Sequence, residues 1–182
     1  MDQTVVIRRA APDDARGIAR VHVASWRTTY RGIVADDLLD NLSVDRRAAF
    51  WSSTLSDPDD ASVNYVAVDA DGRIVGFASG GPERDGTPGF GSELYAIYLL
   101  EAFQGQGLGQ RLVAPVVSAL LDAGRRSMLV WVLAANPARE FYARLGGRQV
   151  ASKQVAMGRD DLEEVAYGWD DLSALAASLT SD

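Results

Sequence analysis

Three glycines at alternate positions mark the part of the chain best suited to chemistry. Gly105, Gly107 and Gly109 lie in the run Gln104-Gly-Gln-Gly-Leu-Gly-Gln-Arg111, between an apolar stretch and a helical pattern. Glycine leaves main-chain amides unobstructed, and the free N–H groups and dipole of a helix N-terminus attract anions. The run therefore predicts either a site for a phosphate-bearing ligand or a plain glycine-rich connector.

Two well-known phosphate loops do not fit this run. A P-loop requires a lysine beside its last glycine, whereas the only lysine of the chain is Lys153, in a later strand pattern. The dinucleotide fingerprint requires a third glycine three residues after its second, and here Gln110 stands three residues after Gly107. Both loops are excluded, although a nucleotide-binding module of another kind remains an alternative.

A single carboxylate stands out in the apolar stretch before the glycines. Glu93 is the only acidic residue between Asp85 and Glu101. Its place in an otherwise apolar run makes it a candidate functional residue. The alternative is a solvated carboxylate at the end of a strand.

The elements that must position these groups follow the order β-α-α-β-β-β-α-β-α-β-β, which is typical of an α/β domain. Strands are predicted at 4–9, 63–68, 74–80, 93–100, 127–133, 149–156 and 163–169, and helices at 13–26, 35–55 with a break near 42–43, 107–123 and 136–145. The Asp71-Gly72 turn predicts an antiparallel hairpin, and Asn136-Pro137 predicts a helix cap followed by the first helical residue. Pro115 is expected to kink its helix.

Composition limits the class of protein. The 182 residues include 47% hydrophobic ones and carry a net charge of -7, so we expect one domain, 1–182, with a tail at 172–182 that is an amphipathic helix or a frayed end. The negative charge disfavours nucleic acid or membrane partners and favours a cationic one. Residues 101–150 are the exception, with 6 Arg against 3 acidic residues.

Residue types that are scarce in the chain exclude several kinds of site. The chain has no cysteine, which excludes disulfides and a cysteine nucleophile, and one histidine, His22, so we expect no metal site. No leader pattern or apolar run of about 20 residues is present, and cytoplasmic residence is expected by default.

Three motifs of the chain resemble, in their residues and spacing, those of the GNAT superfamily of acetyl-CoA-dependent N-acyltransferases. These motifs are Gln104-x-x-Gly107-x-Gly109 after an apolar strand, the buried strand that ends at Leu133, and Asn136-Pro-Ala-Arg-Glu-Phe-Tyr142-Ala-Arg-Leu-Gly146. The element order extends the resemblance from the first strand to Trp169. The chain departs from the family pattern at Glu101, where proline is common.

The resemblance implies a fold and a set of site residues. The fold is α/β, a GNAT-like mixed, mostly antiparallel central sheet with splayed central strands and flanking helices. Acetyl-CoA would be bound by Ile97, Tyr98, Leu99, Gln104, Gly105, Gln106, Gly107, Leu108, Gly109, Gln110, Asn136 and Arg139, with Arg111 or Arg144 as further sources of positive charge. Glu93 would act as general base and Tyr142 as the acid that protonates the thiolate, while Trp26 and Tyr30 would wall the acceptor pocket or pack in the core.

Aminolysis of a thioester needs a neutral amine, a stabilised oxyanion and a proton for sulfur. Because the chain offers neither cysteine nor a Ser-His pair for an acyl-enzyme, we expect direct transfer in a ternary complex to a cationic primary amine, on a small molecule or a peptide N-terminus. A non-catalytic acyl-CoA sensor is the alternative within the same fold. Exposed edge strands make a homodimer a further expectation.

Overall fold

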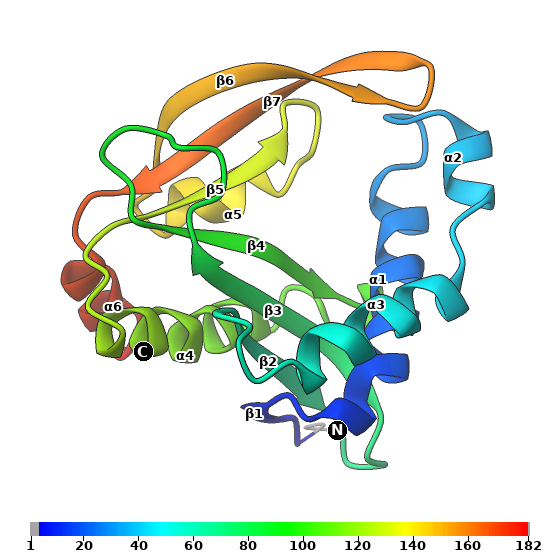
Figure 1. Cartoon of the computed structure of the whole chain (residues 1–182), viewed down its shortest axis with the longest axis horizontal. Helices are drawn as coiled ribbons and strands as arrows, with labels where there is room; N and C mark the ends of the chain where they lie inside the picture. The colour runs from blue at the N-terminus through cyan, green and yellow to red at the C-terminus, as the bar shows by residue number, and fades with distance from the viewer. Residues whose placement is uncertain (1–3, 182) are drawn as a thin grey trace.

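The computed structural model describes residues 4–181, and in this part of the chain the strands form one seven-stranded sheet in the order β1-β2-β3-β4-β5-β7-β6 (Figure 1). The strands are β1 (Val6–Arg9), β2 (Val63–Val68), β3 (Ile74–Pro82), β4 (Ser92–Leu99), β5 (Met128–Leu133), β6 (Arg148–Met157) and β7 (Asp160–Trp169). Neighbouring strands are antiparallel except β4 and β5, which are parallel. The predicted mixed, mostly antiparallel sheet is confirmed.

Helices cover both faces of this sheet. They are α1 (Ala15–Thr29), α2 (Asp36–Asp40), α3 (Val44–Ser56), α4 (Leu108–Asp122), α5 (Arg139–Arg144) and α6 (Leu172–Leu179), with short 3-10 helices at η1 (Pro12–Asp14) and η2 (Glu101–Phe103). Figure 1 shows α1 and α3 against one face, which we call the α1 face, and α4 and α6 against the opposite face, which we call the α4 face.

The two central strands separate soon after they begin. β4 and β5 pair only at Ser92 with Met128 and at Glu93 with Leu129. Beyond Glu93, a β-bulge places Tyr95 as an extra residue against β3, and bulges bend a strand and increase its twist. The strands diverge from this point, so the predicted splay of the central strands is confirmed, and a gap opens in the middle of the sheet.

Alternating apolar side chains fill the core on each face. On the α4 face, Leu112 and Val116 of α4 pack with Leu94 of β4, and all three are fully buried. On the α1 face, Ile18 of α1 and Phe77 of β3 form the corresponding layer.

Two predicted helix boundaries differ from the structure. The helix expected from Pro137 begins at Arg139, because the Asn136 side chain accepts a hydrogen bond from the Ala138 amide (2.9 Å) and holds residues 136–138 in a separate turn. The helix expected to end at Trp26 continues to Thr29. α4 runs from Leu108 to Asp122 and includes Pro115.

The predicted tail, 172–182, contains the helix α6, in which Leu172 and Leu175 are buried; residue 182 lies outside the described residues. The Asp171 side chain caps this helix by accepting hydrogen bonds from the Ser173 and Ala174 amides. Within residues 4–181, none of the helices combines the length and the apolar character that crossing a membrane would require.

Candidate active site

A cavity of about 690 Å³ occupies the gap between β4 and β5. Its walls come from the diverging halves of these strands, the turn before α4, the segment around α5 and the C-terminal end of α1. Of the residues predicted for the site, it is lined by Ile97, Tyr98, Leu99, Gln104, Gly105, Gly107, Gly109, Gln110, Asn136, Tyr142 and Tyr30. Gln106, Leu108, Arg139, Glu93 and Trp26 are predicted site residues that do not line it.

The glycine turn forms one end of the cavity. Gly107 is the N-cap of α4 and has φ of +76°, a conformation that other residues adopt at a cost. Gly109 lies against α5, and a Cβ atom there would lie 3.0 Å from the Phe141 ring, which would have to shift by a few tenths of an ångström. The turn therefore presents the N-terminus of a 15-residue helix to the cavity, an arrangement suited to an anion.

Positive charge near this turn comes from a residue other than the predicted Arg139. Arg139 is exposed and does not line the cavity, whereas Arg144, further along α5, does. Arg111 is engaged elsewhere, because its guanidinium donates a hydrogen bond to the Val5 carbonyl (2.7 Å). The Gln104 side chain also has a structural role, since it donates to the Leu99 carbonyl (3.0 Å) and ties the end of β4 to the turn.

Tyr142 reaches the cavity from α5, on the α4 face. Its side chain is buried, and burial raises the pKa of its hydroxyl well above the ordinary value. The hydroxyl is therefore protonated at neutral pH, as a group that donates a proton to a thiolate must be.

A cluster of hydroxyls lies on the other side of the gap. The buried Asn136 side chain donates to the Tyr30 hydroxyl (3.3 Å), and this hydroxyl is 3.5 Å from that of Tyr98. Burial raises the pKa of both tyrosines. These neutral groups can donate hydrogen bonds into the cavity, which makes this cluster a polar patch in a largely apolar wall.

Glu93 is buried beside the gap, where β4 and β5 begin to separate. Arg84 binds both of its carboxylate oxygens, through Nη2 to Oε1 (2.7 Å) and Nε to Oε2 (3.1 Å). The same guanidinium lies 4.2 Å from the centre of the Tyr95 ring, which lines the cavity. Glu93 thus stands behind the cavity wall with its lone pairs engaged, and a role for it as base stays a prediction.

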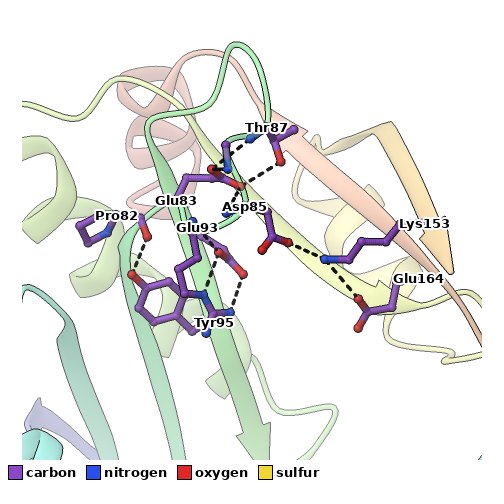
Figure 2. Close-up of polar contacts among 10 residues, drawn as sticks. Pro82, Glu83, Asp85, Thr87, Glu93, Tyr95, Lys153 and Glu164 are labelled. Atoms are coloured by element: carbon purple, nitrogen blue, oxygen red, sulfur yellow. Dashed lines mark hydrogen bonds and ion pairs between the residues drawn. The ribbon is translucent and has the colours of Figure 1, made fainter. Parts of the chain in front are cut away.

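A second group of charges stands beside β5 (Figure 2). Lys153 of β6 lies 4.1 Å over the Trp131 ring, which lines the cavity, and forms ion pairs with Asp85 and, at 3.8 Å, with Glu164 of β7. Glu83 is bound by the amides of its own loop, 85–87. Sequence reasoning considered Glu83 and Asp85 for a cationic acceptor or as a solvated loop, but it missed Lys153 and Glu164, because strands far apart in the chain bring them to this group.

Trp26 and His22 pack inside the protein. Trp26 lies against Tyr30 with ring centres 4.6 Å apart and planes tilted by 54°, and it packs against the apolar cluster that contains Tyr30 and Leu133. Of the two interpretations of Trp26, packing in the core therefore fits its position. His22 is buried among the rings of Trp26, Phe77 and Tyr98, and neither ring nitrogen has a hydrogen-bond partner among the described residues. Burial lowers its pKa to about 4, so it is neutral at neutral pH.

Comparison with known proteins decides the family of this fold and site. A sequence model of the Acetyltransferase (GNAT) family matches residues 23–147. The chain belongs to the GNAT family of acetyltransferases. It is 42% identical over 175 residues to YuaI, an uncharacterized N-acetyltransferase of Bacillus subtilis, with 96% of this chain and 98% of YuaI covered. It is also 30% identical to an aminoglycoside N(6')-acetyltransferase type 1 of Stenotrophomonas maltophilia, with 88% and 90% covered.

Solved structures confirm the GNAT fold. The PaiA N-acetyltransferase of Thermoplasma acidophilum, in complex with coenzyme A, superimposes with a TM-score of 0.65 at 17% identity and covers 91% of this chain and 99% of its own. YncA of Salmonella typhimurium, with its cofactor acetyl-CoA, gives 0.68 at 19% identity, with 93% and 94% covered. Together with its relatives, the family makes this GNAT chain an acyltransferase.

Proposed function

We propose that this GNAT chain transfers the acetyl group of acetyl-CoA to a primary amine by direct attack in a ternary complex. One observation carries the proposal: a single cavity runs from a helix N-terminus built for an anion to a buried tyrosine acid, through the gap in the sheet. Gly105, Gly107 and Gly109 would bind the pyrophosphate through main-chain amides, with Arg144 adding charge. The diverging β4 backbone at 97–99 would face the pantetheine arm.

The fit to this cosubstrate rests on the shape of the glycine turn. Gly105 and Gly107 have φ of +71° and +76°, a backbone conformation that other residues adopt at a cost, so glycine allows the turn to present its amides. Two relatives in the same fold carry coenzyme A or acetyl-CoA, which supports the same ligand here. No group of three or more His, Cys, Asp or Glu side chains that could hold a metal ion occurs in residues 4–181.

Tyr142 would donate the proton that the departing thiolate needs, as its position on the cavity and its protonated state at neutral pH favour. A covalent acyl-enzyme is disfavoured, since the chain lacks cysteine and its one histidine is buried away from the cavity. Attack by the amine on the thioester therefore remains the simplest route.

A cationic acceptor is favoured by charges beside the gap. Figure 2 labels four carboxylates, at Glu83, Asp85, Glu93 and Glu164, and the cation Lys153; with Arg84, which binds Glu93, the net formal charge of this group is -2. Excess negative charge beside a cavity attracts a cationic ligand. Similarity to an aminoglycoside acetyltransferase is consistent with such an acceptor.

The proposal is tested by thiol release from acetyl-CoA across three amines: 1,4-diaminobutane, kanamycin and a peptide with an N-terminal alanine. We expect release with at least one of them, together with the matching acetylated amine by mass spectrometry. Calorimetry with acetyl-CoA, CoA and ATP separates the alternatives. Binding of acetyl-CoA without transfer would favour the acyl-CoA sensor, and preference for ATP would favour a nucleotide-binding module.

A homodimer stays part of the proposal. β6 stands at one end of the sheet, and an unpaired edge is a surface on which a second copy can add a strand. Light scattering after size-exclusion chromatography should give about twice the 19.5 kDa mass of one chain. A mass equal to one chain would contradict the dimer without affecting the transfer reaction.

A further inference from the structure

The carboxylates beside the gap are not equally free to act. Glu83 accepts hydrogen bonds from amides of its own loop, Asp85 is paired with Lys153, and Glu93 holds Arg84 with both oxygens. A carboxylate whose lone pairs are already bound to a cation is a weak base, because a proton must displace that cation. Glu164 is the one in Figure 2 whose ion pair is long, 3.8 Å to Lys153.

Glu164 does not line the cavity, but it stands next to residues that do, at the end of the gap where Asn136 lies. It pairs with Leu133, the last residue of β5, and its neighbour Glu163 accepts a hydrogen bond from the Ala134 amide at the start of the turn that carries Asn136. Asn136 in turn binds the Tyr30 hydroxyl, and both residues line the cavity. The Glu164 side chain keeps only 18% of its surface exposed.

From this placement we propose that Glu164, rather than Glu93, takes up through water the proton that the acceptor ammonium must lose. The assignment rests on the proposed amine transfer. An alkylammonium has a pKa near about 10, so a base must deprotonate it before it attacks at neutral pH. Glu164 then moves the proton to solvent along the partly exposed side of its carboxylate.

The electron and proton balance is closed by residues already described. Glu164 removes one proton from the ammonium, and the nitrogen lone pair forms a bond to the thioester carbonyl carbon. The carbon–sulfur bond breaks with its electron pair on sulfur, which takes a proton from the Tyr142 hydroxyl. After the new carbon–nitrogen bond has formed, the nitrogen loses a second proton, which returns the Tyr142 tyrosinate to the neutral hydroxyl. The net products are an amide, a thiol and one proton.

The charges that face Glu164 tune it as a base. Burial raises its pKa, and the carboxylates of Asp85 and Glu93 raise it further, while the Lys153 ammonium lowers it. Glu164 in turn raises the pKa of Tyr30. A raised pKa brings a carboxylate closer to the operating pH, where proton transfer is most effective. Because a protonated carboxylate cannot act as a base, kcat should fall at acid pH as Glu164 becomes protonated.

The test compares the pH profiles of kcat for E164Q, E93Q and K153M. Acetyl-CoA is saturating, and the amine is whichever of 1,4-diaminobutane, kanamycin and the alanine-terminated peptide the wild type acetylates fastest. E164Q should lower kcat by about 10²-fold or more. It should also lose the acid limb of the profile, that is, the fall of kcat toward low pH, whereas E93Q should keep this limb. K153M removes the cation that lowers the Glu164 pKa, so its acid limb should move to higher pH.

The K153M profile separates a base from a merely structural carboxylate. If Glu164 only fixes Lys153, the two variants should lose the same activity and neither should shift the limb. An unchanged limb in E164Q, or an unshifted one in K153M, would overturn the assignment; the K153M profile alone decides if E164Q does not fold. A wild type that acetylates none of the amines would instead contradict the proposed function itself.

Discussion

The buried side chain of His22 makes the free energy of unfolding depend on pH, and its environment sets the direction of the change. The histidine is 8% exposed and lies between aromatic rings, and neither of its nitrogens has a hydrogen-bond partner within residues 4–181. Burial is the main cause that lowers its pKa from 6.5 to about 4, and the charge of Arg47 adds to the effect. The unfolded chain therefore binds a proton between these two values while the folded chain does not.

The sign follows from this difference in proton binding. The contribution of neutral His22 to stability is fully present above pH 6.5, is lost as the pH falls from 6.5 toward 4, and is absent below both values. A difference of one pKa unit corresponds to about 1.4 kcal/mol, so the full effect is about 3 kcal/mol, of which about 2 kcal/mol is lost between pH 7.5 and 5.

The assay is urea unfolding of the wild type, His22→Phe and His22→Leu at pH 7.5, 6.5 and 5. Both variants remove the titrating group and keep an apolar side chain among the rings of Trp26, Phe77 and Tyr98. Their free energy of unfolding should fall by about 2 kcal/mol less than that of the wild type between pH 7.5 and 5. Other groups titrate in all three proteins and cancel in this comparison. Equal falls would refute the claim that His22 is buried neutral.

Three further substitutions test the site. Gly109→Ala should weaken binding of CoA about 10-fold, because the added Cβ contacts the Phe141 ring and shifts the turn that would hold the pyrophosphate. Its free energy of unfolding should change little, because the higher helix propensity of alanine offsets this contact. Tyr142→Phe should lower kcat about 10²-fold and leave the affinity for acetyl-CoA within a few-fold. Arg84→Met should leave Glu93 buried without its cation and lower the free energy of unfolding by about 2 kcal/mol, less than for a fully buried pair because the Arg84 side chain is 59% exposed. Each of these has a control variant or a contradicting outcome. Gly91→Ala adds a Cβ that meets only the Arg125 side chain at 4.0 Å, so calorimetry should find CoA binding unchanged; equal loss in both glycine variants would exclude the turn as the cause. Steady-state rates that Tyr142→Phe leaves intact would remove its role as acid. Adding Glu93→Gln to Arg84→Met should restore most of the lost stability in urea unfolding, and no recovery would contradict the uncompensated charge.

The sequence predicts the elements of the fold well because their signals are local. Alternating apolar residues, the Asp71-Gly72 turn and the glycines after β4 each act within a few residues of one another. The boundary error before α5 has a local cause of another kind. The Asn136 side chain caps a turn that precedes the helix. An asparagine that caps a turn and one that caps a helix look the same in the sequence, so the two cannot be told apart there.

The site is predicted less completely because half of it depends on distant pairing. The glycine turn and Tyr142 carry motifs, and both line the cavity. Glu93 stands out in the sequence as the only acid in its stretch, but its partner Arg84 engages both oxygens across the β3–β4 loop. The position of Glu164 beside the gap depends on β7 lying next to β5, a register that no short stretch of sequence encodes.

The most direct test of acetyl transfer is a stoichiometric one. Acetyl-CoA labelled in the acetyl group is incubated with the wild type and the fastest amine of the panel, and free thiol and labelled amide are counted in the same sample. Direct transfer through the gap predicts one labelled amide for every thiol released, with the label absent from the protein itself. Thiol without labelled amide, or label retained on the chain, would contradict transfer to an amine in a ternary complex.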